Sequence, residues 1–179
     1  MFFFNAYIPS NQRHSLVRRD KMRNQRKADA ICELQGIGEY RNVRAVCLLN
    51  QMEFGVSLQI NVVGYPMLNR IRCQQPIIAF HIHEGNSCTG TNENPFLNAK
   101  GHYNPNRCQH PYHAGDLGNL FINRNGSAKM SMVNDRFTVN EVIGRVMILH
   151  ASFDDFKTQP SGNSGAMIAC GVIRRYEGH

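Results

Sequence analysis

The sequence contains no tryptophan, no long apolar run and no pair of cysteines in a CxxC spacing. A membrane helix needs about 18 or more apolar residues in a row, so we expect no membrane-spanning segment and no membrane partner. The missing CxxC pairs exclude zinc-ribbon and thioredoxin-type motifs. The short apolar start MFFFNAYI precedes the basic residues instead of following them, which is the reverse of an export signal. We therefore expect a cytoplasmic protein, in which most cysteines are reduced thiols.

The formal net charge is +7, and almost all of this net positive charge lies in one short segment. Residues 1–27 carry seven basic residues and one acidic residue, whereas residues 28–179 carry thirteen and twelve. A nearly neutral body lacks the basic face of a nucleic-acid-binding protein, so we expect no nucleic-acid partner. We expect residues 1–27 to form a basic, disordered tail and residues 28–179 to form one domain. The alternative is a basic arm that contacts anionic partners.

Helical periodicity is also scarce, and most of residues 28–179 has the pattern of short strands. In GVSLQINVVGYP the apolar residues alternate, which places Val56, Leu58, Ile60 and Val62 on one face. FTVNEVIGRVM is the nearest helix candidate, and its glycine weakens it. Asn125-Gly126, between NLFIN and SAKMSMV, is a strong β-hairpin signal. The eight strand candidates predict an all-β sandwich or barrel; they lie in ADAICELQG, VRAVCLLNQ, GVSLQINVVGYP, PIIAFHIHE, NLFIN, SAKMSMV, IGRVMILH and MIACGVIRR.

Two connections are unusually long, residues 84–116 and residues 151–166. Loops longer than about 12–15 residues without structure of their own are usually functional or disordered. Both begin next to a histidine, and six of the eight histidines lie in or beside them, which favours a function. These six are His81, His83, His102, His110, His113 and His150.

The loop HYNPNRCQHPYHAGD predicts a zinc site. His102, His110, His113 and Asp116 offer three nitrogens and one carboxylate oxygen, the closed four-coordinate set of a structural zinc site. The alternative is a polar loop that happens to be rich in histidine.

The remaining histidines predict a second metal site. His81 and His83 project from the same face of a strand, although an HxH triplet alone is often an accident of alternation. With His150 they form a nitrogen-only group, which suits Cu(II). His102 has two ring nitrogens and can serve both groups.

Four segments resemble the copper/zinc superoxide dismutase family, in the family's order and with its internal spacing. They are FHIHEGNSC, GHYNPNRCQHPYHAGDLGN, IGRVMILHASFDD and PSGNSGAMIACGVI. The resemblance covers about residues 28–174 and is greatest to short bacterial forms without an export signal. It implies an eight-stranded antiparallel Greek-key β-barrel, an immunoglobulin-like sandwich, with two long functional loops. It also implies copper and zinc as cofactors and superoxide anion as the substrate, disproportionated to dioxygen and hydrogen peroxide.

The resemblance assigns a role to each donor. It implies copper ligands at His81, His83, His102 and His150, and zinc ligands at His102, His110, His113 and Asp116. His102 would also be catalytic, as the group that donates a proton to the nascent peroxide. Asp154 matches the aspartate that links one copper histidine to one zinc histidine.

The cysteines divide into three pairs. Cys88 and Cys170 match the intrasubunit disulfide of the family. Cys32 and Cys47 lie in predicted strands and are expected to be core thiols. Whether Cys73 and Cys108 form a second disulfide stays open, because sequence does not determine connectivity.

One position departs from the family pattern. In GAMIACGVI, Met167 occupies the position of the family's arginine, which attracts and orients superoxide at the catalytic site. A thioether carries no charge, so we expect reduced efficiency, with Lys157 partly replacing the attraction.

The same departure supports an alternative function, a non-catalytic or weakly active protein that binds copper and zinc. A dinuclear hydrolase is disfavoured, because the closed zinc set has no open position and no general base is evident nearby. The resemblance does not determine the oligomeric state, because members of the family occur as monomers and as dimers, and a homodimer stays open.

Overall fold

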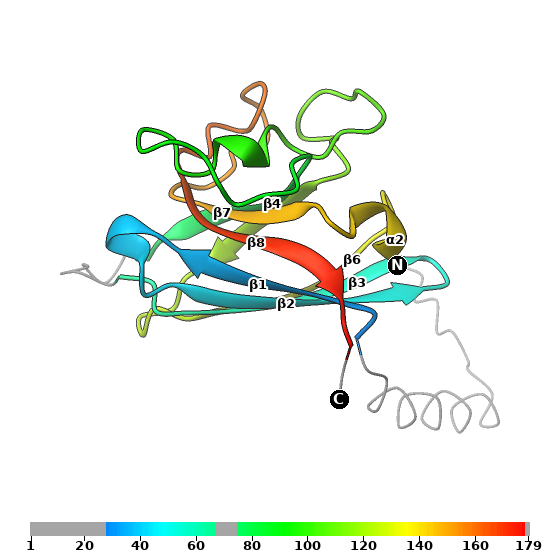
Figure 1. The fold of residues 1–179 in the computed structure, drawn as a ribbon, viewed down its shortest axis with the longest axis horizontal. Helices are drawn as coiled ribbons and strands as arrows, with labels where there is room; N and C mark the ends of the chain where they lie inside the picture. Colours follow the sequence, from blue (N-terminus) through cyan, green and yellow to red (C-terminus); the bar gives the residue numbers. More distant parts are fainter. Residues whose placement is uncertain (1–27, 67–74, 178–179) are drawn as a thin grey trace, which may run out of the picture.

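The computed structural model describes residues 28–66 and 75–177 as an all-β fold (Figure 1). The basic tail and Cys73 lie outside these residues. Each of the eight predicted strands is present. They are β1 (Ala30–Gly36), β2 (Arg44–Met52), β3 (Gly55–Val63), β4 (Ile77–His83), β5 (Asp116–Phe121), β6 (Ala128–Asn134), β7 (Val146–His150) and β8 (Met167–Arg175), with short helices η1 (Gly38–Tyr40), η2 (Leu97–Ala99) and α2 (Val139–Val142). Within the described ranges, no helix is long and apolar enough to cross a membrane.

The strands form one antiparallel sheet in the order β5-β4-β7-β8-β1-β2-β3-β6. The end strands β5 and β6 contact each other, so the sheet curls into a nearly closed barrel. Consecutive strands β3 and β4 are not neighbours in this order, and neither are β6 and β7, which is the crossing pattern of a Greek key. The expected eight-stranded antiparallel β-barrel is confirmed.

The predicted hairpin at Asn125-Gly126 is wrong in one respect. The turn itself exists, because the amide of Asn123 donates to the carbonyl of Ser127 at 2.7 Å. However, β5 pairs with β4 and β6 pairs with β3, at opposite ends of the sheet order. A local turn signal cannot report this, because the partner of each strand is decided by distant residues.

The segment FTVNEVIGRVM, the nearest helix candidate in the sequence, contains a single helical turn, α2. The amide of Thr138 donates to the Glu141 carboxylate at 2.6 Å, which satisfies an amide at the start of the helix. Gly144 then adopts φ +82°, a left-handed conformation that glycine tolerates and that ends the helix before β7.

Strands β4 and β7 are buried on both faces, which sets the position of the site. In β4 the side chains of Ile78, Phe80 and Ile82 belong to the barrel core. The alternate residues His81 and His83 point to the outer face and are nevertheless buried. The two long loops, green and orange in Figure 1, lie together over this side of the barrel. The loops therefore bury polar residues against the outer wall of the barrel.

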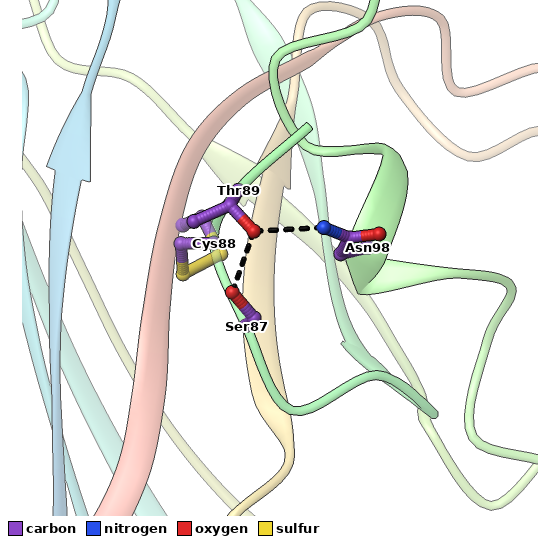
Figure 2. The surroundings of a disulfide bond; sticks show 5 residues. Ser87, Cys88, Thr89 and Asn98 are labelled. Carbon is purple, nitrogen blue, oxygen red and sulfur yellow. Dashed lines mark hydrogen bonds between the residues drawn. A yellow bond between two sulfur atoms is a disulfide. The ribbon is translucent and has the colours of Figure 1, made fainter. Parts of the chain in front are cut away.

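The first long loop is tied to β8 by a disulfide between Cys88 and Cys170, whose Cα atoms are 5.7 Å apart. Figure 2 shows that hydrogen bonds join two parts of the first long loop beside this disulfide. The Thr89 hydroxyl is 2.8 Å from the Ser87 hydroxyl and accepts a hydrogen bond from the Asn98 amide at 2.8 Å. Both cysteines pack in a small apolar cluster on the outer face of β7, with Met167 at its edge.

The other described cysteines are free thiols. Cys32 and Cys47 face each other across β1 and β2, fully buried in the core, as expected. Burial raises the pKa of Cys47 to about 12 and raises that of Cys32 further, so both thiols stay protonated. Cys108 is exposed.

Candidate metal centre

Six buried histidines and two buried aspartates gather between the outer barrel wall and the two loops. The ligand atoms form two groups, each with its atoms within 4.8 Å of one another, and His102 belongs to both. One group is His81, His83, His102 and His150; the other is His102, His110, His113 and Asp116. The structure thus brings together the residues that the sequence predicts as ligands.

In the all-histidine group, His83 and His150 approach each other closely. Their Nε2 atoms are 3.3 Å apart. The Nδ1 atom of His83 lies 2.8 Å from the Lys100 carbonyl, and that of His150 lies 3.2 Å from the Gly165 carbonyl. A carbonyl only accepts, so both rings carry their proton on Nδ1 and direct Nε2 lone pairs at each other. Two lone pairs this close repel, and a cation between them removes the repulsion.

Asp154 fixes the tautomers of two further rings. Its carboxylate oxygens lie 2.9 Å from Nε2 of His81 and 2.9 Å from Nε2 of His110, one histidine from each group. An ionised carboxylate accepts hydrogen bonds, so both rings carry the proton on Nε2 and present an Nδ1 lone pair to the centre. Gly162 lies against the Asp154 carboxylate and has φ +68°. A Cβ at this position would lie 1.9 Å from the carboxylate, so only glycine fits here. The carboxylate therefore prepares one ligand atom for each group.

The mixed group is arranged around the Asp116 carboxylate. Nδ1 of His102 lies 2.7 Å from Oδ1, and Nδ1 of His110 lies 3.1 Å from Oδ2. The amide of His113 donates to Oδ2 at 3.0 Å, and its Nδ1 lies 3.4 Å away. Three ring nitrogens and a carboxylate thus converge, the donor set that zinc accepts.

Buried polar atoms without a hydrogen bond show what the centre needs. Among the described residues, the buried side-chain nitrogen and oxygen atoms without a partner are all ring nitrogens of this cluster: Nδ1 of His81, Nε2 of His102, Nδ1 of His110 and Nδ1 of His113. An unsatisfied buried polar atom costs about 1–3 kcal/mol, so four in one cluster is a heavy penalty. Metal coordination would satisfy them, and His102 would use both of its nitrogens, with Nδ1 in the mixed group and Nε2 in the all-histidine group.

Burial keeps three histidines of the all-histidine group neutral. Desolvation lowers the pKa of His81 to about 4, that of His83 to about 3 and that of His150 to about 2. Burial alone would raise the pKa of Asp154, but hydrogen bonds from His81, the Phe156 amide and His110 lower it to about 2. Neutral imidazoles and an ionised carboxylate are the protonation states that bind metal ions.

The metal-free protein is therefore expected to lose stability as the pH falls below about 6.5. Unfolded histidines take up protons near that pH, whereas His81, His83 and His150 in the folded protein do so only at about pH 4 or below. The unfolded state then binds more protons, and each histidine lowers the free energy of unfolding by about 1.4 kcal/mol per pH unit. Urea unfolding of chelator-treated protein between pH 7 and pH 5 measures this. A flat profile would contradict the prediction.

A cavity of about 780 Å³ leads to the all-histidine group. Its wall includes His83, His102, His150 and Met167, which is the cross-strand partner of His150. Lys157, the cation expected from the sequence to compensate for Met167, is not among the residues that line this cavity. Among the described residues the lysine on the wall is Lys100, together with Glu84 and Glu93.

Three supporting residues were missed by sequence reasoning. Asn119 on β5 bonds both backbone groups of Asp154, at 2.7 Å and 2.9 Å. Gln159 bonds both backbone groups of His110, and the Arg136 guanidinium bonds backbone carbonyls of the loop that carries His113. All three act on backbone across long sequence separations, so no local motif marks them.

The chain matches a family model described as copper/zinc superoxide dismutase over residues 56–173. It is 34% identical over 134 residues to superoxide dismutase [Cu-Zn] 2 of Aquifex aeolicus, covering 67% of this chain and 72% of that protein. It is 35% identical over 108 residues to superoxide dismutase [Cu-Zn] of Photobacterium leiognathi, covering 53% and 62%. The crystal structure of the clock protein EA4 superimposes with a TM-score of 0.68 at 28% identity, covering 82% of this chain and 94% of that one. The matched region contains every donor described above, and this chain belongs to the copper/zinc superoxide dismutase family.

Proposed function

We propose that this protein disproportionates superoxide to dioxygen and hydrogen peroxide at a copper and zinc centre bridged by His102. The observation that carries the proposal is the position of this ring in both donor groups. Its Nδ1 faces Asp116 at 2.7 Å, and its buried Nε2 has no partner. A protein that only stored metal ions would not need one imidazole shared between two sites.

The donor sets divide the metals between them. His81, His83, His102 and His150 would hold copper, because nitrogen-only ligation suits Cu(II). His102, His110, His113 and Asp116 would hold zinc, as a closed structural site. Bound copper would supply the one-electron reduction and oxidation of two superoxide anions, which with two protons give one dioxygen and one hydrogen peroxide.

The chain's own residues would bring the substrate and a proton to this centre. The cavity gives a small anion access to the side of the cluster where His83 and His150 lie. Asp116 holds Nδ1 of His102, so Nε2 is the nitrogen of that ring that can take a proton and give it to the product. Asp154 keeps Nε2 of His81 protonated, which reserves Nδ1 of that ring as a ligand.

Metal analysis of the purified protein, beside a superoxide assay with and without added copper, tests the proposal. We expect one copper and one zinc per chain and activity that depends on copper. Zinc binding without any gain in activity on adding copper would refute the catalytic function.

Met167→Arg is expected to raise the rate of superoxide disproportionation about tenfold at low ionic strength. Met167 lines the cavity beside His150, and a guanidinium there would attract the anion. Electrostatic steering raises association rates by roughly 10- to 1,000-fold and weakens as salt is added. The assay compares wild type with Met167→Arg and the neutral control Met167→Gln across a salt series. An unchanged rate and salt dependence would show that Met167 does not limit substrate capture.

The second candidate function is binding of copper and zinc with little or no catalysis. The observation that favours it is Met167, since the cavity wall then carries one lysine against two glutamates among its described residues. Such a wall does little to attract an anion, and a thioether suits Cu(I). A copper-loaded protein without activity, in which Met167→Arg also fails to restore activity, would favour this function over dismutation.

A further inference from the structure

Residues 110–116 carry His110, His113 and Asp116, three of the four donors of the mixed group, yet almost all of this segment is irregular loop. A metal site on a loop needs its backbone held from outside, because loops are the more mobile part of a fold. Within the segment the structure provides one backbone hydrogen bond, from the Asp116 amide to the His113 carbonyl at 3.2 Å. Backbone bonds from outside the segment reach Gly115, whose amide donates to the Tyr103 carbonyl at 2.8 Å and whose carbonyl accepts from the Ile82 amide at 2.9 Å. The backbone groups of His110 and the carbonyls of His113 and Asp116 are bonded by two side chains from distant parts of the chain.

Gln159 holds the beginning of the segment. Its Nε2 donates to the His110 carbonyl at 2.7 Å, and its Oε1 accepts from the His110 amide at 3.0 Å. One side chain thus satisfies both backbone groups of a ligand residue, as a neighbouring strand would. The same loop carries Asp154, which binds the imidazole of His110 at 2.9 Å. The second long loop therefore fixes His110 at its backbone and at its ring.

Arg136 holds the end of the segment. It follows β6, and its own amide donates to the Asn134 side chain at 2.8 Å. The guanidinium donates to the His113 carbonyl at 2.9 Å, to the Asp116 carbonyl, and more weakly to the Pro111 carbonyl at 3.4 Å. A planar fork with five donors can serve three carbonyls at once, and a lysine ammonium cannot reproduce this geometry.

We infer that Gln159 and Arg136 are positioning residues that hold the zinc-ligand segment in its binding geometry before zinc enters. The inference rests on the proposed function, because it takes zinc as the occupant of the mixed group. Neither side chain is among the ligands, and both act through the backbone of ligand residues. The all-histidine group shares only His102 with the mixed group and has no donor in this segment, so loss of either contact should affect zinc far more than copper.

The test measures zinc and copper dissociation constants of the full-length, metal-free protein, each metal alone, by competition with a chelator. The variants are Gln159→Ala, Arg136→Met and Arg136→Lys. The matched controls are Asn98→Ala, which removes a surface amide bonded to Thr89 in the first loop (Figure 2), and Arg175→Met, which removes an exposed guanidinium bonded to Asn140. We expect the zinc dissociation constant to rise about tenfold in all three variants, because outer contacts of metal ligands are typically worth roughly 10- to 100-fold in affinity.

The copper dissociation constants of the three variants should stay within about twofold of wild type, because the lost contacts support zinc ligands. The zinc and copper dissociation constants of the two controls should also stay within about twofold of wild type. Arg136→Lys should resemble Arg136→Met, because it keeps the charge and loses the fork. If the variants weaken copper and zinc equally, or leave zinc unchanged, the inference is overturned. If wild type itself binds no zinc, the proposed function fails before the variants are compared.

Discussion

Asp154→Asn is expected to lower the affinity for one of the two metals by roughly 10- to 100-fold and to reduce superoxide disproportionation correspondingly. The carboxylate accepts from Nε2 of His81 and from Nε2 of His110, at 2.9 Å each. An asparagine has one oxygen acceptor, and its NH₂ group would face the other ring. That ring must then move its proton to Nδ1, where it blocks the lone pair that would bind the metal. Metal content after dialysis and the dismutation rate measure the loss.

Asp155→Asn is the matched control for this experiment. It makes the same chemical change one residue away, at a partly exposed aspartate whose carboxylate accepts hydrogen bonds from the amides of Lys157 and Thr158. We expect both metals to bind Asp155→Asn as they bind wild type. Equal losses of metal affinity in Asp154→Asn and Asp155→Asn would contradict the prediction. They would mean that metal binding depends on the conformation of the loop and not on the tautomers of His81 and His110.

Loss of the disulfide is expected to lower the free energy of unfolding by about 4–5 kcal/mol, the chain-entropy value for a very long closed loop. Cys88 and Cys170 are 82 residues apart in sequence, and both pack in the apolar cluster on the outer face of β7. The double variant Cys88→Ser/Cys170→Ser should therefore unfold at much lower denaturant concentration, and its first long loop should exchange amide hydrogens faster.

Cys108→Ser serves as the control, because Cys108 is an exposed free thiol. Denaturant unfolding of metal-free protein measures the difference without a contribution from bound metal. A loss below about 1 kcal/mol, far short of the chain-entropy value, would show that the bond constrains the unfolded chain less than its length suggests.

Sequence reasoning predicted the strands well because their signals are local. Val56, Leu58, Ile60 and Val62 alternate with polar residues, and the structure buries all four in the core. The donors were also accessible from sequence, because histidine is uncommon and its crowding between residues 102 and 113 is visible without a fold. The pairing of β5 was not accessible, because the turn at Asn125-Gly126 says nothing about which distant strand each neighbour joins.

The supporting contacts of the site lay beyond sequence reasoning for the same reason. Gln159 is 49 residues from His110, and Arg136 is 23 residues from His113. Both use common polar side chains to bind backbone, and a backbone group has no signature in a sequence. Asp154 was found only through the family resemblance. The compensating role of Lys157 stays a prediction, although Lys157 is not among the residues of the cavity wall, because charge alone does not tell where a loop places a lysine.

The two-faced burial of β4 has a consequence for how this chain tolerates insertions. Phe80 and Ile82 fill the barrel, while His81 and His83 between them face the loops. Shifting a strand by one residue exchanges its two faces, so a single-residue insertion before Phe80 would send imidazoles into the apolar interior and a phenyl ring under the loops. Folding and metal loading would fail together, whereas a similar insertion in the exposed stretch of the first loop would leave both intact.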